Sequence, residues 1–158
     1  MLRLIFLLAM LFVISAHDAV AEIAGSATVI DGDTIEIRGQ RIRLFGIDSP
    51  ESAQLCQAGQ KPYRCGQQPA LALADRIGER TVRCQERDED RYGRVVAVCY
   101  AGGEDLDRWM VEQGWAVAFR KYSLDYVDAE NDARDAGRGI WQGAFEMPWE
   151  WRAARRNH

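Results

Sequence analysis

Three short apolar runs separated by two glycine turns occupy residues 29–51 of this 158-residue chain. The first turn holds Asp31-Gly32-Asp33, and the second is centred on Gly39. Glycine and aspartate favour tight connections between paired strands, so the stretch predicts a three-stranded meander. A chain organised around such a meander is constrained to a fold built on a sheet.

Four charged side chains are expected to approach one another at the ends of these strands. They are Asp33, Arg43, Asp48 and Glu51. Carboxylate oxygens suit a hard divalent cation, whereas the guanidinium fork suits a phosphate. This combination predicts the hydrolysis of phosphodiester bonds.

Two motifs resemble those of the staphylococcal nuclease (thermonuclease) family. The first is DGDT at 31–34 followed by RLFGIDSPE at 43–51, which is similar to the family's DGDT turn and its R-L-x-x-[IV]-D-[ST]-P-E segment. The second is DRYGR at 90–94, which is similar to the family's D-x-Y-G-R segment. Together they fix residue types at many positions in a defined order, which makes coincidence a poor explanation.

The resemblance implies a role for each candidate residue. Ca²⁺ would be the metal, with Asp33, Asp48 and the backbone carbonyl of Ser49 as its ligands. Arg43 and Arg94 would bind the phosphate oxygens, and Glu51 would orient or deprotonate the attacking water. Tyr92 and Tyr122 would contact the substrate, partly by stacking on bases.

Each of these residues also has a simpler interpretation. Aspartate in a glycine-containing turn is often only turn chemistry, and Asp48 before Ser-Pro could cap a loop. Glu51 and the two tyrosines could be solvated loop residues, and Arg94 could be a charge at a strand edge. Arg43 is harder to explain in this way, since it alternates with apolar neighbours on a predicted strand.

The order of the predicted elements indicates a fold of mainly β class with added helices. Strands are expected at 23–30, 34–37, 42–47, 81–85 and 94–100, with a short extended segment at 115–119. Helices are expected at 69–80, 104–113 and 124–136. Three strands, a helix and two more strands predict a five-stranded OB-fold Greek-key barrel with three helices, which is also the fold that the family resemblance implies.

Residues 1–21 have the pattern of a signal peptide. Arg3 precedes an apolar run at 4–14, and Ala19-Val20-Ala21 has the form of a cleavage site. We therefore expect export to a secreted or periplasmic location after cleavage before Glu22; the alternative is an uncleaved membrane anchor. Residues 22–158 are then expected to form a single domain of the staphylococcal nuclease type.

The four cysteines are Cys56, Cys65, Cys84 and Cys99. They contain no Cys-x-x-Cys pair, which argues against a zinc site, and an even number in an exported chain indicates disulfides. Three pairings are possible. Cys84–Cys99 across a hairpin, with Cys56–Cys65 closing the loop after residue 51, fits the predicted strands; four buried thiols are the alternative.

The remaining charges narrow the possible functions. The net charge is −4, which argues against a tight, charge-driven binder of nucleic acid but less against an enzyme with local contacts. The two histidines are His17, in the signal peptide, and the terminal His158, so a histidine base is not expected. The basic tail at 149–156 could contact nucleic acid, but it is interpreted as a short solvated end.

The sequence thus predicts an exported, calcium-dependent nuclease that hydrolyses DNA and RNA with low base specificity. By resemblance it would leave 3′-phosphates. The first alternative is a catalytically inactive OB-fold module of the cell envelope that binds nucleic acid or protein. The second is an accessory domain of a surface complex.

Overall fold

The computed structural model describes residues 22–156. The expected signal peptide at 1–21 and the terminal His158 lie outside the described residues. Within residues 22–156, no helix is both long and apolar enough to cross a bilayer.

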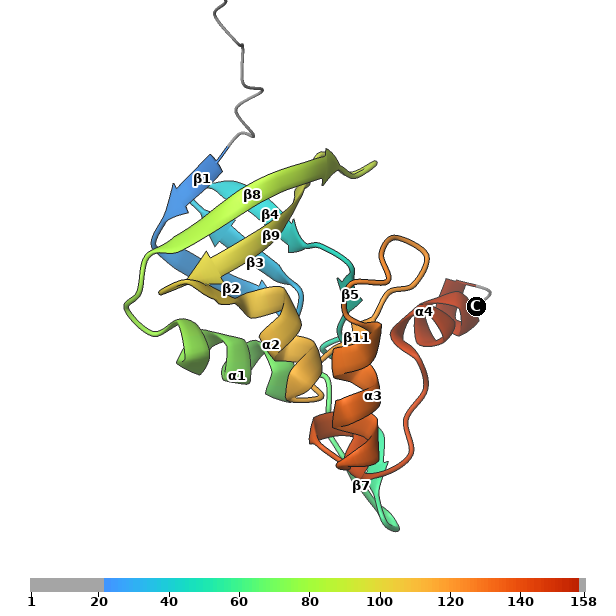
Figure 1. Cartoon of the computed structure of the whole chain (residues 1–158). Coiled ribbons are helices and arrows are strands. Elements are labelled where there is room, and N and C mark those ends of the chain that lie inside the picture. Colours follow the sequence, from blue (N-terminus) through green and yellow to red (C-terminus); the bar gives the residue numbers. More distant parts are fainter. Residues whose placement is uncertain (1–21, 157–158) are drawn as a thin grey trace, which may run out of the picture.

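The main sheet has the strand order of an OB-fold (Figure 1). The first strand of this sheet is bent at Ser26 and thus divided into β1 and β2. These two halves stand at opposite ends of the hydrogen-bonded path β1-β8-β9-β4-β3-β2. Strand β4 pairs with β9 in parallel, while the other pairs on this path are antiparallel. Counted with the bent strand as one, this is the predicted five-stranded Greek-key arrangement. The strands are β1 (Glu22–Gly25), β2 (Ala27–Asp31), β3 (Thr34–Ile37), β4 (Gln40–Leu44), β8 (Val82–Glu89) and β9 (Val95–Ala101).

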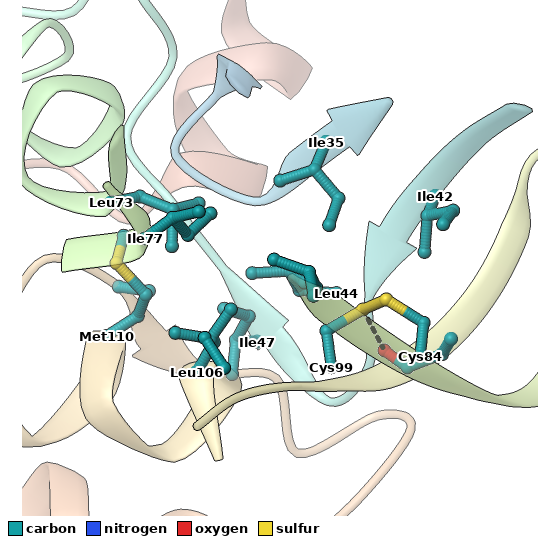
Figure 2. Close-up of a cluster of buried hydrophobic side chains, with 14 of the residues drawn as sticks. Ile35, Ile42, Leu44, Ile47, Leu73, Ile77, Cys84, Cys99, Leu106 and Met110 are labelled. Atoms are coloured by element: carbon teal, nitrogen blue, oxygen red, sulfur yellow. Dashed lines mark hydrogen bonds between the residues drawn. A yellow bond between two sulfur atoms is a disulfide. The ribbon is translucent and has the colours of Figure 1, made fainter. Parts of the chain in front are cut away.

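Side chains alternate along the strands between a face of the sheet that packs in the core and the opposite face. On β4, Ile42 and Leu44 are buried in the core, while Arg43 between them points to the opposite side of the sheet. Figure 2 shows Leu44 beside Ile77 and Leu106 of the helices, while Ile42 lies on the side of the Cys84–Cys99 disulfide. Cys84 and Cys99 face each other across β8 and β9 and form a disulfide inside this core, as predicted.

The expected strand at 42–47 is interrupted, and this correction matters for the site. Gly46 has a φ of +69°, a backbone conformation that favours glycine, so the chain turns after Leu44. Strand β5 (Ile47–Asp48) then pairs with β11 (Val117–Ala118) instead of continuing in the main sheet. The turn therefore carries Asp48 to the region where Asp33 lies.

Three helices occupy the predicted regions, with shorter bounds. They are α1 (Gln68–Ile77), α2 (Leu106–Glu112) and α3 (Val127–Asp135). Leu73, Ile77 and Met110 on the expected apolar faces are fully or almost fully buried. Strand β10 (Glu104–Asp105) takes the place of the first residues of the second predicted helix and pairs with β9.

The prediction of three helices was wrong, because the C-terminal segment forms a fourth. Helix α4 (Pro148–Arg156) lies near β5 and the loop that follows β11 (Figure 1). Pro148 begins the helix, Glu150 is in its first turn, and two arginines are in its last turn, which all favour a helix with this polarity. The basic tail is therefore an ordered helix rather than a solvated end.

The segment between β5 and α1 is held by the second predicted disulfide. Strands β6 (Cys56–Ala58) and β7 (Lys61–Tyr63) pair as a small hairpin, and Cys56 is bonded to Cys65. The short 3₁₀ helix η1 (Gly139–Gln142) leads from α3 toward α4, and its Ile140 packs with this disulfide.

Candidate nuclease site

A cleft of about 680 Å³ opens on the side of the sheet where Arg43 points. Its walls come from the turn after β2, from β4, from the loop after β5, from the β8–β9 hairpin, from residues 119–122 and from α4. Segments that are far apart in the sequence therefore meet in one cavity. All of the predicted site residues line this cleft except Asp48, which is fully buried beneath it.

The guanidinium of Arg43 joins the two predicted metal ligands. Its Nη1 donates to Asp33 Oδ1 at 2.7 Å, and its Nη2 donates to Asp48 Oδ1 at 3.1 Å. Burial by itself would lower the pKa of Arg43, but the charges of Asp33 and Asp48 outweigh it and raise the pKa. Arg43 is therefore a fixed cation that holds both carboxylates beside it.

The DGDT turn packs directly against the residue that follows Asp48. A side chain at Gly32 would meet Ser49 Oγ at 2.0 Å and Pro69 Cβ at 2.5 Å, so only glycine allows this approach. The approach lets the backbone N–H of Ser49 donate to Asp33 Oδ2 at 3.0 Å. Glycine at position 32 thus has a packing role in addition to its turn role.

Asp31 is a cleft residue that the sequence analysis did not single out. Its Oδ1 accepts a hydrogen bond from the backbone N–H of Asp33 at 3.0 Å. Burial and then the nearby charge of Asp33 raise the pKa of Asp31 to about 6. The motif that identified Asp33 contains Asp31 as well, so the signal was present in the sequence.

Arg94 reaches Asp33 through a hydroxyl group. Its Nη1 lies 3.4 Å from Thr34 Oγ1, which in turn donates to Asp33 Oδ1 at 3.2 Å. Its Nε donates to Asp90 Oδ2 at 2.7 Å. Burial would raise the pKa of Asp90, but hydrogen bonds from the Arg94 N–H, the Arg94 guanidinium and the Tyr92 N–H lower it overall. Arg94 is thus anchored at the turn of the hairpin and lines the same cleft as Arg43.

Arg152 is a second site residue that the sequence analysis did not single out. It extends from α4 and donates to Asp48 with both terminal nitrogens, at 3.0 and 2.7 Å. Its Nη1 also donates to Glu51 Oε1 at 2.7 Å. Burial would lower the pKa of Arg152, but its bonds to Asp48 and Glu51 raise it. Arg152, from the C-terminal helix, therefore bridges Asp48, the predicted metal ligand, and Glu51, the predicted general base.

Glu51 lies at the rim of the cleft, after Pro50. Its side chain is 36% exposed, so one face is available to water while the other pairs with Arg152. Its backbone N–H donates to the Oε1 of Gln54 at 3.2 Å, and Gln54 is itself fully buried. The local backbone is thus fixed although the carboxylate is accessible.

The two predicted substrate tyrosines line opposite parts of the cleft and are largely exposed. Tyr92 is 69% exposed at the tip of the β8–β9 hairpin, with the guanidiniums of Arg91 and Arg94 over its ring at 4.8 and 5.7 Å. Tyr122 is 61% exposed and meets Phe119 edge-on at 4.9 Å. Both rings are accessible to a ligand.

The donor atoms available for a cation are all oxygens. A carboxylate has about four acceptor positions, and Asp33 and Asp48 each use three of them within the protein. The three carboxylates of Asp33, Asp48 and Glu51 pair with only two guanidiniums, those of Arg43 and Arg152, so the group has one excess negative charge. Within residues 22–156, no group of three or more His, Cys, Asp or Glu side chains is close enough together to hold a metal ion. A hard cation would therefore take only two carboxylates, with backbone carbonyl and water oxygens completing its shell.

An OB-fold sheet that gathers carboxylates and arginines in one cleft is the arrangement expected of a phosphodiesterase. Sequence comparison agrees: residues 41–143 match the family described as staphylococcal nuclease homologues, and the chain belongs to that family. It is an enzyme of the nuclease class. Helix α4 lies beyond the matched residues.

Three relatives cover most of the chain. It is 43% identical to "succinoglycan biosynthesis protein ExoI" of Rhizobium meliloti (strain 1021), over 89% of this chain and 77% of the relative. It is 33% identical to "micrococcal nuclease" of Shigella flexneri, over 82% of this chain and 79% of the relative. It is 34% identical to an "uncharacterized endonuclease" of Escherichia coli, over 90% of this chain and 93% of the relative.

Proposed function

We propose that this protein is an exported, calcium-dependent nuclease that hydrolyses phosphodiester bonds of DNA and RNA and leaves 3′-phosphates. The observation that carries the proposal is the guanidinium of Arg43 held between the carboxylates of Asp33 and Asp48. This arrangement sets a phosphate-binding cation beside two ligands for a hard metal ion.

The roles of the side chains follow from their places in the cleft. Calcium held by Asp33, Asp48 and the carbonyl of Ser49 would supply positive charge next to the phosphate. Arg43 and Arg94 bind the non-bridging oxygens and stabilise the charge that grows on them as water attacks phosphorus. Glu51, with one accessible face, positions the water and takes its proton. The P–O5′ bond breaks, and the products carry a 3′-phosphate and a 5′-hydroxyl.

Arg152 acts through Glu51 and Asp48 rather than on the substrate. Its fork holds the two carboxylates side by side, which fixes the direction of the accessible Glu51 oxygen. A base that is held in this way loses little orientation entropy when the water arrives. We therefore assign Arg152 as a positioning residue.

Low base specificity follows from the kinds of contact that the cleft offers. The arginines and the calcium ion address phosphate oxygens, which are the same at every nucleotide. The exposed rings of Tyr92 and Tyr122 can stack on any base. Both DNA and RNA therefore fit the proposal.

A cleavage assay on the oxidised protein tests this function. DNA and RNA are incubated with the protein in calcium or in a chelator, and the termini of the products are identified. We expect digestion in calcium only, with rates lowered by about 10²–10⁴-fold in Glu51→Gln. Glu146→Gln, at an exposed glutamate outside the cleft, is the matched control and should keep the wild-type rate.

A second candidate function is a binding module of the cell envelope without catalysis. The observation that raises it is the 43% identity to the relative named "succinoglycan biosynthesis protein ExoI". Binding of DNA or RNA without digestion in the same assay would support this candidate. The expected export signal fits both functions.

A further inference from the structure

We propose that α4 extends the substrate site, so that a nucleic-acid strand continuing past the phosphate at Arg43 lies along this helix. Arg156 would bind a phosphate further along the strand, and Tyr122 with Trp149 would form the apolar wall beside it. This inference rests on the proposed function and adds the direction that the substrate takes.

One face of α4 belongs to the cleft. Trp149, Arg152 and Arg156 follow one another at spacings of three and four residues, which places them on the same side of a helix. All three line the same cavity as Asp33 and Arg43. The cavity is thus continuous from the predicted cleavage point to the last turn of α4.

Arg152 anchors this face to the catalytic end of the cleft. Its bonds to Asp48 and Glu51 fix the middle of the helix, so the residues on either side of it have defined positions. Arg156 lies one turn further, about 6 Å along the helix axis. That distance spans about two stacked nucleotides at 3.4 Å each.

Aromatic side chains continue the wall from β11 to α4. The rings of Phe119 and Trp149 are stacked, with centroids 5.4 Å apart and planes 5° apart. Tyr122 meets the edge of Phe119 and is 61% exposed. An exposed ring supported by a stacked pair is a suitable platform for a base.

The charges along the cleft favour this direction over the opposite one. The β8–β9 hairpin has a net charge of −1 along the lining, from Asp88, Glu89, Asp90, Arg91 and Arg94. Asp90 already pairs with Arg94. The α4 side contributes Lys121 and Arg156, and Arg156 is exposed and has no ion-pair partner within residues 22–156. A polyanion that extends beyond the first phosphate is therefore attracted to α4.

The test compares two neighbouring arginines of the same helix. Arg156 lines the cleft, whereas Arg155 stacks on Trp151 at 3.7 Å and does not line it. Arg156→Ala and Arg155→Ala remove the same charge from the same turn. Binding of a fluorescent dinucleotide and of a fluorescent octanucleotide of single-stranded DNA is measured in chelator, by anisotropy, over a range of salt concentrations.

The octanucleotide should bind more tightly than the dinucleotide, and we expect Arg156→Ala to reduce this gain in affinity about fivefold at 0.1 M salt. The reason is that one lost phosphate contact on a single strand lowers the slope of log affinity against log salt concentration by about 0.7. Arg155→Ala should keep both the gain and the slope of the wild type. Equal effects of the two variants, or no effect of either, would overturn the inference. If the wild type neither binds nor digests nucleic acid, the proposed function fails instead.

Discussion

Replacement of Arg152 by methionine should destabilise the protein more than the same replacement of its neighbour Arg155. The methionine keeps an apolar stem of similar length but removes three hydrogen bonds, two to Asp48 and one to Glu51. Asp48 is fully buried, so it cannot replace the lost donors with water.

The size of the effect follows from what remains around Asp48. Loss of one partner from a buried ion pair typically costs about 3–5 kcal/mol. Asp48 keeps its bond to Arg43, and the side chain of Arg152 is 31% exposed, so we expect a smaller loss of about 2 kcal/mol. With an m-value of about 2 kcal/mol/M, the urea midpoint should fall by about 1 M.

Equilibrium urea unfolding in chelator measures this loss of stability. Two control variants separate the contact with Asp48 from the contact with Glu51 and from the loss of an arginine on the helix. Glu51→Gln removes only the half-exposed partner and should cost less than about 1 kcal/mol. Arg155→Met changes an exposed arginine on the same helix and should have almost no effect. If Arg152→Met costs no more than Arg155→Met, then the contact with Asp48 contributes nothing and the reasoning is wrong.

Three further predictions concern stability. Cys84→Ala with Cys99→Ala removes the bridge over a 15-residue separation and should lower the free energy of unfolding by about 3 kcal/mol in urea titrations. Burial raises the pKa of Asp107 well above 3.8, so the stability that its carboxyl contributes is complete below pH 3.8 and is lost as the pH rises above that value. Wild type should therefore lose stability relative to Asp107→Asn as the pH rises from 3.8, in urea titrations at a series of pH values, and parallel pH profiles would contradict this. Calcium at 100 times its Kd should stabilise wild type by about 2.7 kcal/mol in thermal melts but stabilise Asp33→Asn much less.

The main sheet and the centre of the site could be predicted because their signals are local. Arg43 alternates with two buried residues, Ile42 and Leu44, and this period of two already places its side chain opposite the core. The DGDT turn and the segment up to Glu51 lie within one short stretch, so their meeting requires only tight turns. The predicted strands favoured Cys84–Cys99 among three possible pairings, Cys56–Cys65 was then the remaining pair, and both bonds are present.

The role of Arg152 could not be predicted in this way. Its partner Asp48 is 104 residues away in the sequence, and no periodicity relates residues at such a separation. The segment also lacks a wide apolar stripe, so its arginines were interpreted as solvated charges. Pro148 at its start and two arginines at its end indicate a helix, but they do not show which wall it packs against.

The other differences come from tertiary structure that overrides local preference. The predicted strand at 42–47 is apolar throughout except for Arg43 and Gly46, yet the chain turns at Gly46 to pair with β11. The buried carboxylate of Asp107 accepts hydrogen bonds from the backbone N–H of Phe45, in the turn after β4, and from the backbone N–H of Cys99 on β9. Such contacts depend on the assembled barrel and leave no pattern in the sequence.

The most direct test of the account is the rate of DNA cleavage in calcium for two arginine variants of β4. Arg43→Ala removes the guanidinium that joins Asp33 and Asp48, whereas Arg41→Ala removes an arginine that is 63% exposed on the same strand. We predict a loss of at least about 10²-fold for Arg43→Ala, since it removes a donor to the developing charge. Arg41→Ala should retain the wild-type rate. Similar rates for the two variants, or cleavage that continues unchanged in chelator, would contradict the account.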